Sequence, residues 1–290
     1  MSSDGVPFSI VAIVIGSAFV HAMWNAILKR QKHPELAGGA ISLIGAVSSV
    51  LVALFFTRTV PSFSVVLWSL GAGLFEAAYF VALSKALARA PLGVAYTIAR
   101  GGALLVTWPI SVVWHGERPT PIALVGSFLV AGGLALVGLR SGGKKAERHA
   151  ERRAGLAWSI ACAVFIAGYH LFYKCAMNAG GEPAPVSAVS LALAAVLSLA
   201  WYGRVGTAKI LLDAREHPWP IVIAGLLVTV SFVAFLAGLE RGGAGVIMTL
   251  RNTSVLFAQV FGWLGGERSR PAQVAGVLAV FAGAVCTAWH

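Results

Sequence analysis

The apolar residues of this chain are divided into segments of about bilayer length, separated by short polar gaps. Of its 290 residues, 58% are apolar and only 11% are charged, whereas an average soluble domain is about 25% charged. A helix needs about 20 consecutive apolar residues to cross the hydrocarbon core of a bilayer. The pattern therefore predicts an all-α integral membrane protein.

Hydropathy delimits ten such segments, each of which we expect to be a transmembrane helix. A short basic stretch, residues 141–153, divides them into two groups of five and is too charged to enter lipid. We therefore expect one five-helix unit over residues 1–140, a linker over 141–153, and a second unit over 154–290. The segments are 8–29, 36–56, 64–84, 92–113, 122–139, 155–176, 186–202, 221–239, 244–264 and 272–289.

Short sequences recur in the same order on both sides of the linker, at offsets close to 150 residues. Such self-similarity indicates an internal duplication. Because five is an odd number, the two copies must cross the membrane in opposite directions. Inverted repeats are a transporter architecture with the substrate site near the midplane. The recurring pairs are Phe80-Val81-Ala82 with Phe232-Val233-Ala234, Gly93-Val94 with Gly245-Val246, and Gly116-Glu117-Arg118 with Gly266-Glu267-Arg268.

The basic residues are distributed unevenly between the two sides of the predicted bundle. Of the 22 lysines and arginines, sixteen lie in the linker and the odd-numbered connections, and four lie in the even-numbered connections. Because cytoplasmic loops of membrane proteins carry an excess of Lys and Arg, we expect a cytoplasmic linker and both termini outside, in a multi-pass protein of the cell (inner) membrane. The net charge of +11 is thereby explained without nucleic-acid binding.

Three groups of residues resemble a known family. They are the Trp24-Asn25 pair, Pro109 followed by Trp114-His115-Gly116-Glu117-Arg118-Pro119, and Leu264-Gly265-Gly266-Glu267-Arg268. Together they resemble the EamA-like transporters of the drug/metabolite transporter superfamily. The resemblance implies a ten-helix exporter or exchanger of metabolites with a cavity lined by helices 1, 3, 4, 6, 8 and 9. Two features depart from the family: Gln259 stands near the position that matches Pro109, and the charge count places the termini opposite to their usual cytoplasmic side.

Three charged residues lie deep within predicted spans, namely Glu76, Arg100 and Arg251. A charge at the bilayer centre costs about 2.5 to 3.5 kcal/mol even on the lenient insertion scale, so each needs a partner or a water-filled cavity. The arginines occupy nearly equivalent places in the two halves and would favour a carboxylate or phosphate on the substrate. The alternative is that one arginine pairs with Glu76 and holds the bundle together. If Glu76 is unpaired, it is a candidate carrier of a coupling proton.

Aromatic and polar side chains share one stripe on the first helix and one on the sixth. His21, Trp24 and Asn25 form the first stripe, and Tyr169 and His170 belong to the second. Such groups suit stacking and hydrogen bonding to a small solute, although interhelical hydrogen bonding explains them equally well. Tyr79 and Asn252 are further candidates. No His, Cys or carboxylate cluster has metal-ligand spacing, so we predict no metal and no cofactor.

These observations favour a secondary transporter of a small polar metabolite, with an anionic substrate as one alternative and the lipid bilayer as its surroundings. Two other classes stay open: a non-transporting membrane scaffold or receptor, and an intramembrane enzyme. We expect no enzyme and name no catalytic residue, because no nucleophile or metal motif is present. Ten helices in one chain complete a two-repeat unit, which is compatible with a monomer.

Overall fold

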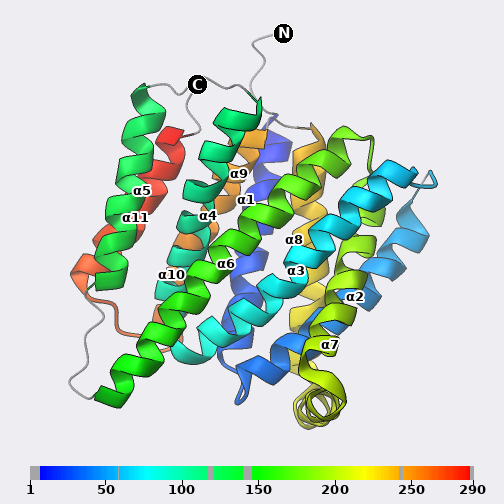
Figure 1. Ribbon diagram of the computed structural model, residues 1–290, viewed down its shortest axis with the longest axis horizontal. Helices are drawn as coiled ribbons and strands as arrows, with labels where there is room; N and C mark the ends of the chain where they lie inside the picture. Colours follow the sequence, from blue (N-terminus) through cyan, green and yellow to red (C-terminus); the bar gives the residue numbers. More distant parts are fainter. Residues whose placement is uncertain (1–6, 58, 116–120, 140–145, 242–243, 288–290) are drawn as a thin grey trace.

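The computed structural model describes residues 7–57, 59–115, 121–139, 146–241 and 244–287, which form an all-helical bundle (Figure 1). Six helices in this part of the chain are long and apolar enough to cross a membrane, and three others contain shorter apolar stretches. The predicted all-α membrane class is thereby confirmed. The helices are α1 (Phe8–Lys29), α2 (Pro34–Phe56), α3 (Phe63–Arg89), α4 (Leu92–His115), α5 (Pro121–Leu139), α6 (Ala146–Asn178), α7 (Pro183–Glu216), α8 (Pro218–Arg241), α9 (Ala244–Asn252), α10 (Ser254–Leu264) and α11 (Pro271–Thr287).

Prolines mark where many of these helices begin. A proline at the first helical position does not destabilise the helix. The N–H that it lacks would have no partner within the helix, and its fixed φ is already that of a helix. In α3 a serine cap replaces the proline: Oγ of Ser62 accepts a hydrogen bond from the amide of Val65. Five helices open with a proline, namely Pro34, Pro121, Pro183, Pro218 and Pro271.

Three elements differ from the predicted segments. Helix α6 begins at Ala146, within the predicted linker, because hydropathy does not detect a polar helix whose Ala, Glu and Arg residues favour helix formation. Helix α7 continues beyond the predicted end at residue 202, through a non-helical Gly203, to Glu216. The ninth predicted segment is interrupted at Thr253, which separates α9 from α10. Predicted features at 116–120, 140–145 and 288–290, including Glu117, lie outside the described residues.

The helices before the linker pack mainly against the helices after it. Helix α3 lies on α6, and α8 lies on α1; α4 also contacts α6, and α10 contacts α1. Helices α5 and α11 lie side by side at one edge of the bundle (Figure 1). Their backbones approach so closely that a Cβ added to Gly133 would stand 2.6 Å from the carbonyl oxygen of Gly276. Small residues permit such contacts between helices in lipid.

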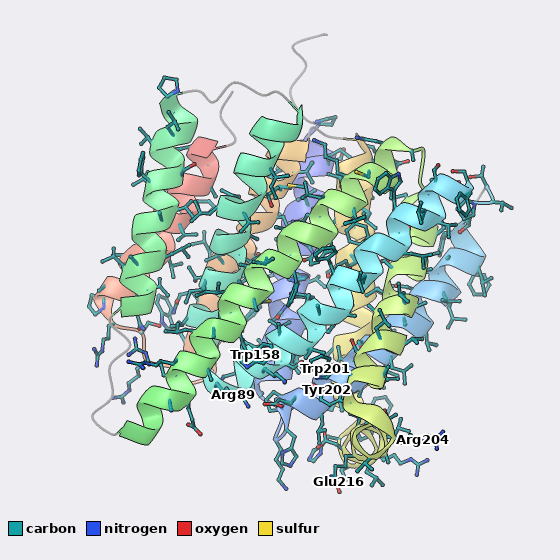
Figure 2. The ribbon with its side chains drawn as sticks, in the orientation of Figure 1. Arg89, Trp158, Trp201, Tyr202, Arg204 and Glu216 are labelled. Carbon is teal, nitrogen blue, oxygen red and sulfur yellow. The ribbon has the colours of Figure 1, made fainter. Side chains whose placement is uncertain are left out.

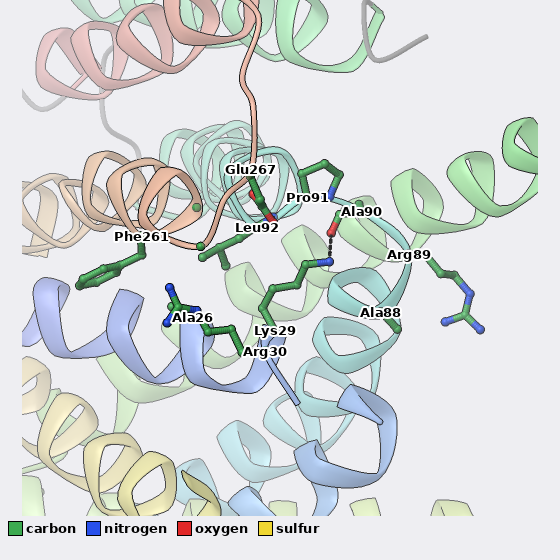
Figure 3. Close-up of a pocket in the computed structure, with 12 residues that line it drawn as sticks. Ala26, Lys29, Arg30, Ala88, Arg89, Ala90, Pro91, Leu92, Phe261 and Glu267 are labelled. Atoms are coloured by element: carbon green, nitrogen blue, oxygen red, sulfur yellow. Dashed lines mark hydrogen bonds between the residues drawn. The ribbon is translucent and has the colours of Figure 1, made fainter. Parts of the chain in front are cut away.

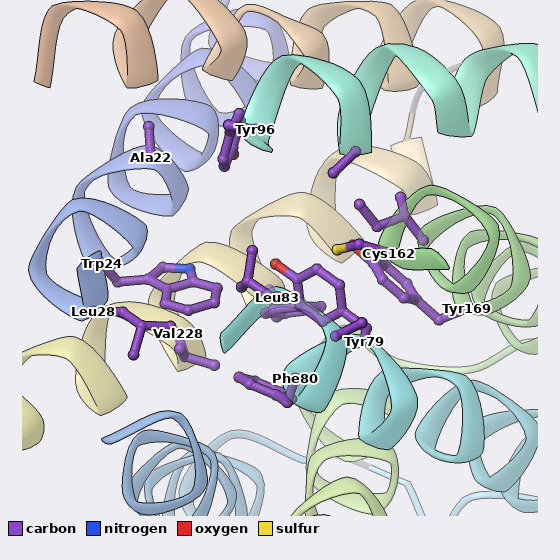
Figure 4. Close-up of a cluster of buried hydrophobic side chains, with 14 of the residues drawn as sticks. Ala22, Trp24, Leu28, Tyr79, Phe80, Leu83, Tyr96, Cys162, Tyr169 and Val228 are labelled. Carbon is purple, nitrogen blue, oxygen red and sulfur yellow. The ribbon is translucent and has the colours of Figure 1, made fainter. Parts of the chain in front are cut away.

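Apolar side chains cover both the interior and the outer surface of the bundle. The interior holds a cluster that includes Trp24, Tyr79, Phe80 and Tyr169 (Figure 4). On the outside, Phe55 is 82% exposed and Phe128 is 78% exposed. An outer surface of this kind suits hydrocarbon rather than water, so the chain is a multi-pass membrane protein.

One end of the bundle, here called the basic end, gathers loops rich in Lys and Arg. It is the end where α1 and α3 finish and where α2 and α4 begin. Contacts define it: Nζ of Lys29 donates to the carbonyl oxygens of Leu87 and Ala90, at 2.7 and 2.9 Å. The guanidinium of Arg89 pairs with Glu35.

Candidate functional site

Two arginines from opposite halves of the chain meet at one histidine in the middle of the bundle. Nη2 of Arg100, on α4, lies 2.5 Å from Nε2 of His21 on α1. Nη2 of Arg251, on α9, lies 2.9 Å from Nδ1 of the same ring. The exposed fractions of His21, Arg251 and Arg100 are 0, 1 and 2%, so all three are closed off from the outside. The structure thus brings together the two arginines that the sequence repeat pairs.

This imidazole cannot satisfy both guanidinium groups at once. An imidazolium would place N–H groups against two cations, so His21 is neutral, and a neutral ring has one acceptor nitrogen. Trp24 Nε1 also points at Nδ1, at 3.3 Å, and the Tyr79 hydroxyl lies 3.3 Å from Nε2. In either tautomer, one arginine faces an N–H instead of a lone pair. The centre therefore holds more donors than acceptors.

The remaining donors of the arginines are only partly satisfied. Nη1 of Arg251 donates to Oγ of Ser17 and, at 2.9 Å, to the carbonyl oxygen of Ser231. Nε of both arginines and Nη1 of Arg100 are buried without a hydrogen-bond partner, as are the hydroxyls of Tyr96 and Tyr169. A buried donor without an acceptor costs about 1 to 3 kcal/mol, and more when it is charged. An anion of suitable shape would supply the missing acceptors.

The buried carboxylate of Glu76 lies apart from these arginines. Its Oε1 accepts a hydrogen bond from the hydroxyl of Tyr173 at 2.5 Å, and that hydroxyl lies 2.7 Å from Oγ of Ser190. Among the described residues no ion pair joins Glu76 to an arginine, and its Oε2 has no hydrogen-bond partner. The alternative of an ion pair between Glu76 and one arginine is therefore wrong.

Hydroxyl groups continue from this carboxylate towards α2 and α8. Oγ of Ser187, on α7, lies 3.3 Å from Oγ of Ser49 on α2, which donates to Oγ1 of Thr229 at 3.2 Å. That oxygen lies 2.6 Å from Oγ of Ser48. All of these groups are buried. Hydroxyls can both donate and accept, so this layer forms a polar band across α7, α2 and α8.

Aromatic rings surround the arginines. The guanidinium carbon of Arg251 stands 4.7 Å from the ring centre of Phe235 and 5.9 Å from that of Phe232. Arg100 stands 5.7 Å from the ring centre of Tyr96. These contacts place a cation against the electron-rich face of a ring. The rings of Phe235, Phe232 and Tyr96 are therefore directed at arginine.

The other predicted site residues surround this centre with different contacts. Asn25 turns away from it, because its Nδ2 donates to the backbone oxygen of His21 at 2.7 Å. His170 packs between Tyr169 and Phe235, at ring distances of 4.6 and 5.2 Å, and makes no hydrogen bond through Nε2. Asn252 is buried directly after Arg251, at the end of α9.

Some residues of the centre were not among the predicted site residues. Ser17 and Ser231 hold Arg251, and Ser190 contacts Tyr173. Ser17 lies one helical turn before His21, so the stripe on the first helix could have indicated it. Ser231 contributes its backbone carbonyl to Arg251, and its Oγ lies 3.3 Å from Nδ1 of His21.

A cavity opens at the basic end, beside the end of α1 (Figure 3). Its volume is about 550 Å³, and its lining comes from α1, the turn between α3 and α4, and the end of α10. Lys29 and Arg30 line it together with Glu267, whose Oε1 accepts a hydrogen bond from the amide of Leu92 at 2.8 Å. This carboxylate therefore caps α4 from the other half of the chain.

Comparisons with known proteins agree on the kind of protein. Residues 153–289 match the EamA-like transporter family. The quaternary ammonium compound-resistance protein QacF of Klebsiella aerogenes is 35% identical over 105 residues, which are 35% of this chain and 89% of that protein. A solved crystal structure superposes with a TM-score of 0.65 at 20% identity, covering 97% of this chain and 98% of the other. That likeness shows a shared fold.

Proposed function

Since this chain belongs to the EamA-like transporters of the drug/metabolite transporter superfamily, we propose that it is a secondary transporter that carries a small organic anion past Arg100 and Arg251. The observation that carries the proposal is the excess of buried donors around His21. Two guanidinium groups share one acceptor nitrogen, and no carboxylate is paired with them in the described part of the chain. A carboxylate, phosphate or phosphonate would accept from both arginines.

The helix contacts support a two-fold arrangement of inverted five-helix halves. In the two halves, α1 corresponds to α6, α2 to α7, α3 to α8, and α4 to α9 with α10. When each helix is exchanged for its counterpart, the contact of α3 with α6 becomes the contact of α8 with α1. The exchange likewise turns α3 on α7 into α8 on α2, and α4 on α6 into α9 and α10 on α1. We propose ten membrane crossings, with α9 and α10 forming one of them. Arg100 and Arg251 then face one midplane site from the two halves.

We further propose that the basic end faces the cytoplasm of a cell (inner) membrane protein, with both termini outside. The positive-inside rule supports this orientation, because Lys29, Arg30 and Arg89 line one cavity at this end. We propose that this cavity is the entrance through which a substrate would reach the arginines. A bound anionic substrate would accept hydrogen bonds from the two arginines in place of His21. The contacts through which His21 joins the two halves would then be lost.

Glu76 is proposed as the site of a coupling proton. It contacts hydroxyls instead of cations, so its charge is not fixed by an arginine. Protonation there would change the number of hydrogen bonds in the hydroxyl band between α7, α2 and α8. The single chain is proposed to function as a monomer, because both arginines and the histidine come from one copy.

An organic cation is the second candidate substrate, because a relative is named for quaternary ammonium compounds. A site for a permanent cation needs a carboxylate or free aromatic faces. Glu76 is a buried carboxylate without an arginine partner, but it lies apart from the two arginines, against Tyr173. Here the faces of Phe235 and Tyr96 are directed at arginines, and two positive charges would repel the solute. The anion is therefore favoured over the cation.

Reconstituted transport with a mixed panel of solutes tests the proposal. Proteoliposomes would be assayed for counterflow of carboxylates, phosphates and phosphonates, with a quaternary ammonium compound in parallel. We expect saturable flux of one anion class, and loss of that flux in Arg251→Gln. Flux of the cation alone, or undiminished anion flux in Arg251→Gln, would contradict the anion site.

A stability measurement separates this role from that of a membrane scaffold or receptor. If the arginines only held the bundle together, Arg251→Gln would lower the melting temperature in detergent and a bound anion would not raise it. We expect the transported anion to raise the melting temperature of the wild type and not that of Arg251→Gln. Arg241→Gln, an exposed substitution on α8, is the matched control for loss of one charge.

A further inference from the structure

Helix α7 contains a sharp elbow at the basic end. Gly203 has φ +64° and ψ −176°, a conformation that only glycine adopts readily. Beyond it the chain forms a further helical stretch that is seen almost end-on in Figure 1, across the direction of the bundle. Oγ1 of Thr207 donates to the carbonyl oxygen of Leu199 at 3.2 Å, so a side chain satisfies a backbone group near the bend.

Contacts with α2 hold the elbow on the bundle in the described part of the chain. Ile210 is fully buried and packs on Gly39 of α2, where an added Cβ would stand 2.7 Å from its Cδ1. The hydroxyl of Tyr202 donates to the backbone oxygen of Glu35 at 3.0 Å. These contacts fix the elbow across the start of α2, so the opposite face is presented outward.

Aromatic side chains place the elbow at the level of the membrane interface. Nζ of Lys85 stands 4.4 Å from the ring centre of Trp158 and 5.5 Å from that of Trp201. Trp158, Trp201 and Tyr202 lie at the same end of the bundle as Arg204 (Figure 2). Trp and Tyr gather where hydrocarbon meets lipid head groups, and Lys and Arg extend their charged ends towards the same layer.

The outward face of the elbow combines an apolar hollow with unpaired positive charge. The hollow has a volume of about 510 Å³ and is lined by apolar groups of Leu199, Ala200, Ala208 and Leu211, with Arg204 at its side. Trp201 is 65% exposed beside it. Within the described part of the chain, no ion pair involves Arg204.

We propose that the elbow of α7 is a binding site for one anionic phospholipid. An acyl chain occupies the hollow, and the head-group phosphate accepts hydrogen bonds from the guanidinium of Arg204. Lys209 and Arg215, both exposed on the same helical stretch, extend the positive potential along the interface. An interfacial helix with apolar and basic groups outward is suited to an anionic lipid surface. The site is separate from the arginines that we propose for substrate.

Quenching of Trp201 fluorescence by brominated lipids tests this proposal in the intact protein. Nanodiscs would contain traces of either brominated phosphatidylglycerol or brominated phosphatidylcholine, in a phosphatidylcholine background. The Trp201 signal is the difference between the wild type and Trp201→Phe. We expect the brominated anionic lipid to quench this signal at about fivefold lower mole fraction, the effect of one basic side chain near a charged surface.

Two variants test whether Arg204 is responsible for the preference for the anionic lipid. Arg204→Gln should abolish the preference for the anionic lipid, whereas Arg215→Gln, which removes the same charge further along the helix, should keep most of it. Both side chains are exposed, so neither change threatens folding. Equal quenching by both lipids in the wild type, or equal loss of preference in the two variants, would overturn the site and leave only ordinary lipid contact or diffuse charge attraction.

Discussion

Arg100 and Arg251 contact opposite nitrogens of a single imidazole ring, that of His21. They approach from α4 and α9, which belong to different halves of the chain. Because only one ring nitrogen can accept, the two arginines compete for it. The one that loses the competition is available to an anion. The ring thus joins the two halves of the chain, and the competition of the arginines for it underlies the anion site that we propose.

Replacement of His21 by Phe should therefore expose the repulsion between the arginines. We expect a lower melting temperature in detergent, because two buried cations lose their shared acceptor. A transported anion should raise the melting temperature of His21→Phe more than that of the wild type. Trp24→Phe, which removes one donor to the ring and keeps both arginine contacts, is the control and should change little. No destabilisation in His21→Phe would count against the shared acceptor.

The Glu76→Gln variant should separate exchange from accumulation. An amide keeps the size of the side chain and a hydrogen bond to Tyr173, but it cannot take up a proton. Counterflow in proteoliposomes should continue in this variant, while accumulation driven by an imposed pH gradient should be lost. Tyr173→Phe, which removes the hydroxyl donor, should retain some gradient-driven uptake. If Glu76→Gln still concentrates substrate, the coupling proton is carried elsewhere.

Loss of the cap on α4 should weaken the basic end. The Glu267 carboxylate accepts from the amide of Leu92 and lies at the positive end of the helix dipole. Glu267→Ala should cost about 1 to 2 kcal/mol of stability, in the range of other helix caps. The measurement is thermal unfolding in detergent, with Arg268→Ala as the control, because the neighbouring Arg268 is exposed. Equal effects of the two substitutions would show that the cap does not matter.

An alanine at Gly203 should destabilise the elbow of α7. The conformation of Gly203, with φ +64° and ψ −176°, costs a residue with a Cβ roughly 1 to 3 kcal/mol, and no neighbour stands within 4 Å of an added Cβ there. The penalty would thus come from the backbone alone. Gly16→Ala, in a helix and equally free of neighbours, should leave the melting temperature unchanged or raise it. Faster proteolysis near residues 204–216 in Gly203→Ala would locate the effect.

The helical segments were predictable because bilayer thickness imposes a length on every apolar run. Boundaries agree closely where a proline or a cap starts the helix, as at Pro121 and Ser62. The helical stretch after Gly203 was missed, because five charged residues within 204–216 lower its mean hydropathy below that of a membrane span. Its helicity depends on packing of Ile210 against α2, which is a tertiary contact.

The candidate site was partly predictable for a similar reason. Buried charge in lipid is costly enough that Arg100 and Arg251 stood out, and the repeat indicated that they would converge. Their common partner, His21, was not predictable. The sequence does not show which polar side chain of α1 lies at the same depth in the bundle as the two arginines. The pairing of Glu76 with Tyr173 depends on how α3 crosses α6. At that crossing Gly71 approaches the ring of Phe172 and Gly168 approaches the ring of Phe75.

The packing of the first helices on the later ones also bears on how the protein is made. Helices α1, α2 and α3 find most of their partners in α6, α7 and α8, which leave the ribosome later. Until then, the surfaces of α1 and α3 that carry His21 and Glu76 have no α6 or α8 to cover them. The first helices must therefore enter the bilayer before the bundle can assemble. The delay is the time needed to translate about half of the chain. The polar centre is completed only after that interval.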